Sequence, residues 1–147
     1  MLAIYTKTFD ELTSKALYDV LQLRSEVFVV EQNCVYQDID GKDQKALHIL
    51  GYKGEKLVAY TRVFKSGDYF ENASIGRVVV KENERQHNYG YDIMKASIEA
   101  IKQHYNETKI KISAQTYLKH FYNNLDFFEV GEEYLEDGIP HIAMIKS

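Results

Sequence analysis

Residues 73–100, ASIGRVVVKENERQHNYGYDIMKASIEA, contain the clearest structural pattern in the chain. Their first part, Ile75–Val80, is apolar and rich in β-branched residues, which predicts a buried strand. The charged and amide-rich run that follows predicts a turn, and the pattern from about Tyr89 predicts a helix in which Met94 and Ile98 lie on one apolar stripe. A strand that passes through a polar turn into a helix is therefore the unit from which we start.

The turn of this unit, Arg85–Gly90 (RQHNYG), has properties that suit an anion. The first N–H groups of a helix have no partner within the helix, and the helix dipole adds partial positive charge there. Gly90 lets a ligand approach the backbone, and Asn88 tolerates a positive φ. An ordinary polar connection is the alternative, because one glycine before a helix is a weak signal and the spacing matches no nucleotide-binding fingerprint.

The remaining patterns predict an α/β (α+β) fold, with a mixed, mostly antiparallel sheet of about six to seven strands flanked by helices on both faces. Thr13 or Ser14 is expected to cap the first helix, and Lys53-Gly54-Glu55 is expected to join a hairpin. Strands are expected at Leu2–Thr8, Ala46–Tyr52, Lys56–Phe64, Lys109–Ser113, Phe127–Glu132 and Ile139–Ile145, and further helices at Glu11–Val30 and Tyr117–Asn124.

Length and composition limit the classes of protein. We expect a single domain over residues 1–147, because this length buries a sizeable core and no linker or repeat interrupts it. No apolar run approaches the roughly 20 residues that span a bilayer. The N-terminal sequence MLAIYTKTFDE also lacks the pattern of a signal peptide. We therefore expect a cytoplasmic protein without a membrane partner.

Charge and cysteine content argue against two kinds of site. The net charge of −4 disfavours a nucleic acid as the main partner, because binding to phosphates needs a cationic surface. The only cysteine, Cys34, excludes an internal disulfide and a cysteine metal cage. His87, His104 and His120 lack the spacing of metal ligands, so we expect no metal site.

The acidic loop Asp38–Asp43 (DIDGKD) resembles a calcium-binding loop at first sight. If Gly41 were the sixth position of such a loop, Tyr36 and Leu47 would stand where carboxylates are required. Two interpretations remain for these aspartates. They form either a solvated acidic turn or the entrance for a cationic substrate.

The order of these elements resembles the GNAT (Gcn5-related) N-acetyltransferase superfamily over almost the whole chain. The pyrophosphate signature of that superfamily, Arg/Gln-x-x-Gly-x-Gly/Ala, corresponds to Arg85–Gly90, with Asn88 in place of the first glycine. The segment Gln115–Phe127 is similar to its Asn-x-x-Ala-x-x-Phe-Tyr-x-x-Leu-Gly-Phe motif, with Asp126 in place of the glycine. The long segment Leu23–His48, with IGRVVV and EDGIPHIAM, is similar to the ElaA-like branch.

This resemblance implies acetyl-CoA as cofactor and an amine of a small molecule or a protein as acceptor, and it is compatible with a homodimer. It implies that the turn holds the pyrophosphate on backbone N–H groups and that the strand before it pairs with the pantetheine arm and polarises the thioester carbonyl. The residues implied in cofactor binding are Val78, Val79, Val80, Arg85, Gln86, His87, Asn88, Tyr89, Gly90, Tyr91 and Gln115.

The resemblance also implies a general acid and leaves the base open. Tyr122 matches the tyrosine that gives a proton to the departing thiolate, although a tyrosine that only packs at a helix end is the alternative. Deprotonating an amine of pKa near 10 at pH 7 costs roughly 4 kcal/mol, so a carboxylate, an imidazole or a water relay is needed. The candidates in ElaA-like motifs are Glu31, His48, Glu136, Asp137 and His141.

From these candidates we predict Glu31 and His48 as catalytic residues, and Glu136 and His141 as substrate-binding residues. For each of them, a loop salt bridge or a hydrogen-bonded structural histidine is the alternative. Arg24 is predicted to hold a substrate carboxylate, and a salt bridge with Glu31 or an aspartate of the loop explains it equally well.

Two functions follow. One is an N-acetyltransferase in which a primary amine attacks acetyl-CoA directly in a ternary complex, and Tyr122 and the polar loop favour it. The other is a non-catalytic module of the same fold that binds acyl-CoA as a sensor or serves as an interaction surface, and Asn88 favours it because asparagine replaces glycine where the cofactor would bind.

Overall fold

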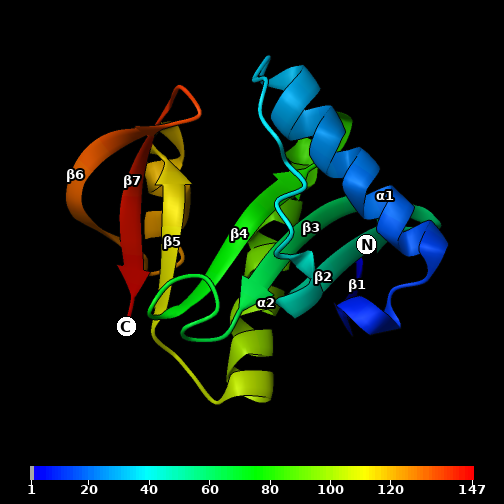
Figure 1. The fold of residues 1–147 in the computed structure, drawn as a ribbon, viewed down its shortest axis with the longest axis horizontal. Coiled ribbons are helices and arrows are strands. Elements are labelled where there is room, and N and C mark those ends of the chain that lie inside the picture. Colours follow the sequence, from blue (N-terminus) through cyan, green and yellow to red (C-terminus); the bar gives the residue numbers. More distant parts are fainter. Residues whose placement is uncertain (1) are drawn as a thin grey trace.

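The computed structural model describes residues 2–147, which form a seven-stranded sheet with helices packed against it (Figure 1). The strand order across the sheet is β1-β2-β3-β4-β5-β7-β6. The strands are β1 Ala3–Thr8, β2 Leu47–Lys53, β3 Lys56–Phe64, β4 Ala73–Val80, β5 Ile110–Gln115, β6 Phe128–Glu136 and β7 Ile139–Lys146, and the α-helices are α1 Ser14–Arg24, α2 Tyr89–Tyr105 and α3 Lys119–Asn123.

The sheet is mixed and mostly antiparallel, as the sequence predicts. Among the strands of residues 2–147, only β4 and β5 run parallel, and they pair at just two positions, Ala73 with Ile110 and Ser74 with Lys111. Beyond these pairs the two strands diverge, which divides the sheet into a β1–β4 half and a β5–β7–β6 half (Figure 1). The divergence leaves Ile75–Val80 without a strand partner on the β5 side within residues 2–147.

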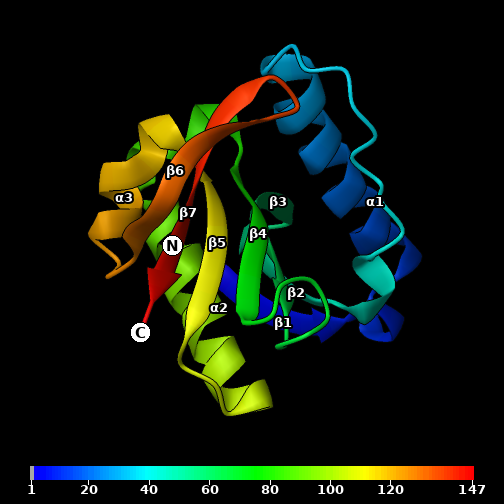
Figure 2. The same cartoon turned by 60° about the vertical axis from the view of Figure 1, so that its left-hand side comes forward.

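Two hydrophobic cores lie on opposite faces of the sheet, which confirms the prediction of helices on both sides (Figure 2). Successive side chains of a strand point to opposite faces. On β2, Ile49 therefore packs in the core that contains Ile93 of α2, and its neighbour Leu50 packs in the core that contains Val20 of α1. The continuous apolar runs of β2 and β3 follow from this burial on both faces.

The first helix differs from its predicted range, Glu11–Val30. It begins at Ser14, because the Thr13 hydroxyl accepts a hydrogen bond from the Ala16 N–H at 3.1 Å, and Phe9–Glu11 forms a separate 3₁₀ turn. After Arg24 the backbone widens into a π-helix over Ser25–Glu31. The apolar spacing does not distinguish the two helix types, so sequence reasoning missed the π segment, a feature that is frequent at functional sites.

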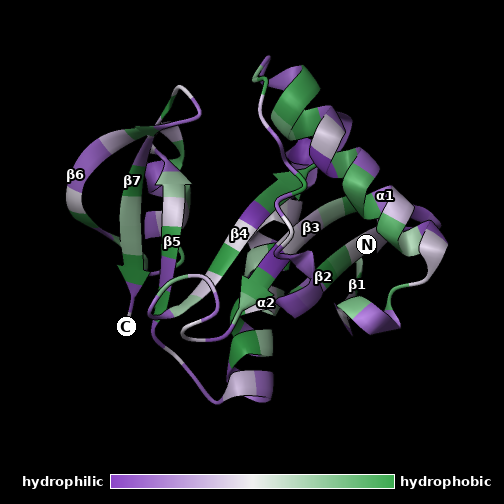
Figure 3. Ribbon diagram, in the orientation of Figure 1, coloured by the Kyte–Doolittle hydropathy of each residue, from purple (hydrophilic) through white to green (hydrophobic). Residues whose placement is uncertain are grey.

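The second helix begins at Tyr89, as predicted, and shows separate hydrophobic and hydrophilic bands in Figure 3. The predicted short helix Tyr117–Asn124 is a 3₁₀ turn over Thr116–Leu118 followed by α3. The predicted hairpin is confirmed, with Lys53 paired to Lys56 across a two-residue loop. Among residues 2–147, no helix has the length and apolarity needed to cross a membrane.

Candidate active site

A cavity of about 470 Å³ lies where β4 and β5 diverge, within the usual size range of small-molecule sites. Its walls come from the π-helix, β4, the start of α2, β5, the segment that contains α3, and the β6–β7 turn. The predicted site residues that line it are Glu31, Val78, Val79, Val80, Arg85, Asn88, Gly90, Tyr91, Gln115, Tyr122, Glu136 and His141. The predicted residues outside its lining are Arg24, His48, Gln86, His87 and Tyr89.

One wall of the cavity is the free edge of β4. On their other side, Val79 and Val80 pair with Tyr60 and Ala59 of β3, so this part of the strand is held in extended form. The β3–β4 register shifts just before these pairs, and Arg77 there has a φ of +49°. The backbone groups of β4 that face the diverging β5 are therefore available to an extended ligand.

The predicted anion-binding turn forms a 3₁₀ helix over Glu82–His87, followed by α2. Asn88 takes the left-handed conformation, with φ +61° and ψ +23°, as its place in the signature requires. Asn88 makes no side-chain cap, so no capping side chain occupies the first N–H groups of α2. A Cβ at Gly90 would lie 3.2 Å from the Phe121 ring, which explains the glycine by close packing.

Arg85 and Glu31 form an ion pair beside this turn. The Arg85 guanidinium donates to both carboxylate oxygens of Glu31, at 2.6 and 2.8 Å, and its Nε donates to the Val80 carbonyl at 3.0 Å. The hydrogen bond that Arg85 donates to Glu31 raises the pKa of Arg85. Because both oxygens of Glu31 are engaged at the start of α2, this geometry favours an electrostatic role near the turn over the predicted role as base.

Three other residues of the signature contribute no side chain to the cavity. Gln86 and His87 are exposed, and the ring of Tyr89 is buried 5.2 Å from that of His87. The predicted contribution of these residues to cofactor binding is therefore limited to their backbone.

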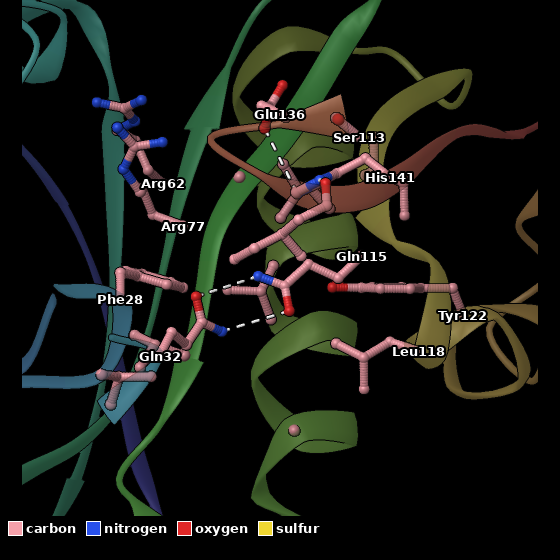
Figure 4. A pocket seen from close by; sticks show the side chains of 18 of the residues that line it. Phe28, Gln32, Arg62, Arg77, Ser113, Gln115, Leu118, Tyr122, Glu136 and His141 are labelled. Atoms are coloured by element: carbon pink, nitrogen blue, oxygen red, sulfur yellow. Dashed lines mark hydrogen bonds and ion pairs between the residues drawn. The ribbon is translucent and has the colours of Figure 1, made fainter. Parts of the chain in front are cut away.

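Tyr122 lies at the inner end of the cavity. Its ring is held edge-on between Phe121 and Phe127, at centroid distances of 5.0 and 6.1 Å, and its hydroxyl points toward Gln115 in Figure 4. Within residues 2–147 this hydroxyl makes no hydrogen bond, and burial raises the pKa of Tyr122. The phenol therefore stays protonated at neutral pH and is able to donate.

Two contacts join the segment after the π-helix to the β5–β7–β6 half of the sheet at this cavity. The side-chain amides of Gln32 and Gln115 donate to each other, each at 3.3 Å (Figure 4). The Cys34 thiol donates to the Asp137 carbonyl at 3.2 Å. Sequence reasoning did not single out Gln32, and its only signal is its place in the long ElaA-like segment.

Arg24 requires a correction. Its side chain is 0% exposed, and it donates to Asp38 at 2.9 Å and to Asp43 at 2.7 Å. The alternative that the sequence left open, a salt bridge with loop aspartates, is therefore correct, because the guanidinium is fully buried, outside the cavity lining, and engaged at all three of its nitrogens.

Both interpretations of the acidic loop are also wrong. Asp43 accepts from Arg62 at 3.0 Å as well as from Arg24, Asp40 accepts from Arg62 at 2.8 Å, and Asp38 lies 2.8 Å from Arg77 Nε. Three carboxylates thus neutralise three arginines beneath the surface. Burial raises the pKa of Asp43, but the hydrogen bonds and positive charges of Arg24 and Arg62 together outweigh it, so the pKa lies below its ordinary value.

His48 is likewise removed from the predicted catalytic set. It is 0% exposed, and both ring nitrogens are engaged, Nδ1 with the Tyr60 hydroxyl at 2.6 Å and Nε2 with the Asp43 carbonyl at 2.9 Å. Burial lowers the pKa of His48. A histidine without a free nitrogen and without access to the cavity does not take a proton from a substrate.

His141 and Glu136 face the cavity from the β6–β7 hairpin (Figure 4). His141 is 6% exposed, its Nδ1 contacts the Ile139 carbonyl at 2.7 Å, and its Nε2 lies 3.5 Å from a Glu136 oxygen. The ring stacks on Tyr134 at a centroid distance of 6.1 Å.

Among the described residues, no group of three or more histidine, cysteine, aspartate or glutamate side chains is arranged to hold a metal ion.

Comparison with known proteins identifies the family. Residues 10–147 match the family described as acetyltransferase (GNAT) domain. The chain belongs to the GNAT acetyltransferases. Within them it belongs to the ElaA-like branch, since it is 47% identical over 138 residues to protein ElaA of Escherichia coli strain K12, covering 92% of this chain and 90% of that protein. A Schizosaccharomyces pombe protein of the UPF0039 group is 41% identical over 94% of this chain and 92% of its own length.

Solved structures agree with this assignment. The GNAT fold of this chain matches the crystal structure of Escherichia coli ElaA with a TM-score of 0.93 and 44% identity. It matches the structure of an acyl-CoA N-acyltransferase from Pseudomonas aeruginosa with a TM-score of 0.93 and 38% identity. Both matches cover 100% of each chain, so the whole GNAT architecture is shared.

Proposed function

We propose that this protein is an N-acetyltransferase that moves an acetyl group from acetyl-CoA to a primary amine by direct attack in a ternary complex. One observation carries the proposal. The free edge of β4 at Val78–Val80, the uncapped start of α2 and the hydroxyl of Tyr122 all face a single cavity. A strand edge, an anion site and a proton donor are the groups that acyl transfer from a nucleotide thioester needs.

The residues present fit an acyl-CoA. The β4 edge offers backbone N–H and C=O groups to the amides of a pantetheine arm, and the left-handed Asn88 turns the chain so that the first N–H groups of α2 are available to a pyrophosphate. Gln115 is able to exchange its 3.3 Å bond with Gln32 for one to the same arm. When bound, acetyl-CoA supplies the acetyl group as an activated thioester.

Tyr122 provides the general acid in this proposal. Because its phenol is buried and protonated, it gives a proton to the thiolate sulfur as the carbon–sulfur bond breaks. The two aromatic neighbours of its ring fix the direction of the hydroxyl, so the donor is positioned before the substrate arrives. Family membership supports this assignment because Tyr122 stands at the matching position of the Phe-Tyr motif.

The test measures release of free thiol from acetyl-CoA with a panel of amines, namely a polyamine, an aromatic amine, an amino acid and a lysine peptide. Calorimetry measures coenzyme A binding in parallel. Tyr122→Phe removes one oxygen and keeps the ring packing, so we expect unchanged binding and a fall in kcat of about 10²- to 10⁴-fold. The control Tyr18→Phe, on an exposed tyrosine of α1, is expected to change neither.

Two results would contradict the proposal at different points. Wild-type protein that binds coenzyme A but transfers acetyl to no amine would favour the non-catalytic acyl-CoA-binding module. Equal rates for the wild type and Tyr122→Phe would remove Tyr122 from the mechanism and leave the transferase activity standing.

A further inference from the structure

We propose that His141 is the base that takes the proton from the acceptor amine and that Glu136 positions it and passes the proton to water. This inference rests on the proposed function and selects one of the five bases that the sequence left open. The two buried histidines among residues 2–147, His48 and His141, differ in their hydrogen bonds, and strand pairing places His141 at the cavity.

In its neutral form, His141 carries its ring hydrogen on Nδ1. A carbonyl oxygen only accepts, so the 2.7 Å contact between Nδ1 and the Ile139 carbonyl requires a hydrogen on Nδ1. The neutral ring then carries its lone pair on Nε2, and Nε2 makes no hydrogen bond within residues 2–147. His48 differs because both of its nitrogens are engaged, so it has no lone pair to offer.

Protonation of Nε2 changes the contact between His141 and Glu136. In the neutral state, Nε2 and the Glu136 carboxylate are two acceptors 3.5 Å apart, with no hydrogen between them. A proton on Nε2 converts this contact into an attraction between an imidazolium and a carboxylate. Glu136 is 50% exposed, so the proton has a direct route to solvent. The pair is arranged to accept a proton inside the cavity and to release it outside.

Strand pairing places His141 at the cavity. His141 on β7 is paired with Gln115 on β5 and with Tyr134 on β6, so the ring belongs to the row of side chains that faces the cavity beside Gln115 (Figure 4). The Tyr122 hydroxyl points toward the same Gln115. An acid for the sulfur and a base for the nitrogen therefore lie around one point of the cavity.

The titratable or charged groups that face His141 are Glu136 and Tyr134 of β6, Asp137 of the turn, and, across the cavity, Arg77 of β4 and Tyr122 of α3.

The proton and electron balance of the step is complete. His141 Nε2 takes one proton from the ammonium group, and the freed nitrogen lone pair forms the carbon–nitrogen bond. The carbon–sulfur bond breaks, and its electron pair stays on sulfur, which receives the proton of Tyr122. Tyr122 regains a proton from the product nitrogen. The proton on His141 leaves through Glu136, so one proton is released to water per turnover.

The experiment compares His141→Gln and Glu136→Gln with the wild type, with acetyl-CoA and the fastest amine of the panel, from pH 5 to 10. His104→Gln, on an exposed histidine of α2, is the matched control. We expect His141→Gln to lower kcat by about 10²- to 10⁴-fold, to lose the rising limb of the pH profile and to keep the affinity for coenzyme A. Glu136→Gln is expected to move that limb to lower pH, because the imidazolium loses its carboxylate.

A second readout needs no activity. Nitrogen-15 NMR of the histidine rings is expected to show His141 as the Nδ1–H tautomer when neutral. An Nε2–H tautomer, or an unchanged pH profile in an active His141→Gln variant, would overturn this inference and leave the transferase proposal intact. Absence of transfer by the wild-type protein with every amine would instead overturn the proposed function and, with it, the role of His141.

Discussion

Replacing Asp43 tests the conclusion that the acidic loop is structural. Its carboxylate accepts from the fully buried Arg24 at 2.7 Å and from Arg62, 1% exposed, at 3.0 Å. In Asp43→Asn the shape is kept, but two buried guanidinium groups lose their shared counter-charge. Breaking a buried ion pair by removing one partner costs about 3–5 kcal/mol. For a chain of this length each kcal/mol lowers Tm by about 2–4 °C, so we expect a fall of about 6–20 °C.

Thermal unfolding followed by circular dichroism measures this change. The control is Asp19→Asn, which removes a carboxylate from an exposed pair with Lys15 on α1, and its Tm is expected to stay within about 2 °C of the wild type. An Asp43→Asn variant that also stays within that range would refute the reasoning. An Arg24→Gln variant with wild-type Tm but lost activity would return Arg24 to substrate binding.

The same variant has an expected pH dependence. The folded-state pKa of Asp43 is lowered, so its stabilising contribution is present above the unfolded pKa of about 4 and is lost as pH falls through the folded pKa. The difference in Tm between Asp43→Asn and the wild type should therefore be full at neutral pH and shrink below about pH 4. A difference that is constant down to the most acidic measurable pH would show that charge is not its cause.

Two further substitutions test the turn before α2. Glu31→Gln frees Arg85 and removes a negative charge next to the proposed pyrophosphate, so we expect calorimetry to show coenzyme A binding about two- to five-fold more tightly. A large loss of kcat with unchanged affinity would instead restore Glu31 as the base. Asn88→Ala is expected to lower Tm by about 2–4 °C because alanine fits the left-handed conformation poorly. Asn88→Gly is expected to keep both Tm and coenzyme A affinity. Equal changes of Tm in the two variants would remove backbone conformation as the reason for asparagine.

Most of the fold was predictable because its signals are local. The apolar runs of β2 and β3, the hairpin loop and the start of α2 at Tyr89 each follow from residues close in sequence. The π-helix over Ser25–Glu31 was not, because such turns are rare and seven residues are too few for the apolar pattern to separate a π turn from an α turn.

The candidate site divides in the same way. The order of elements can be read along the chain, and the signature at Arg85–Gly90 and the tyrosine at position 122 lie within short segments, so the sequence by itself determined the family and the fold. The free edge of β4 exists only because β4 and β5 diverge in the folded sheet and open the cavity. Which polar residues face that cavity was decided only by the tertiary structure. Sequence alone does not separate His48 from His141, because both lie in ElaA-like motifs. Strand pairing and packing bury His48 with both ring nitrogens bonded and leave His141 with a free Nε2 beside Glu136. The availability of a polar side chain depends on partners that are distant in sequence, and only the folded chain brings those partners together.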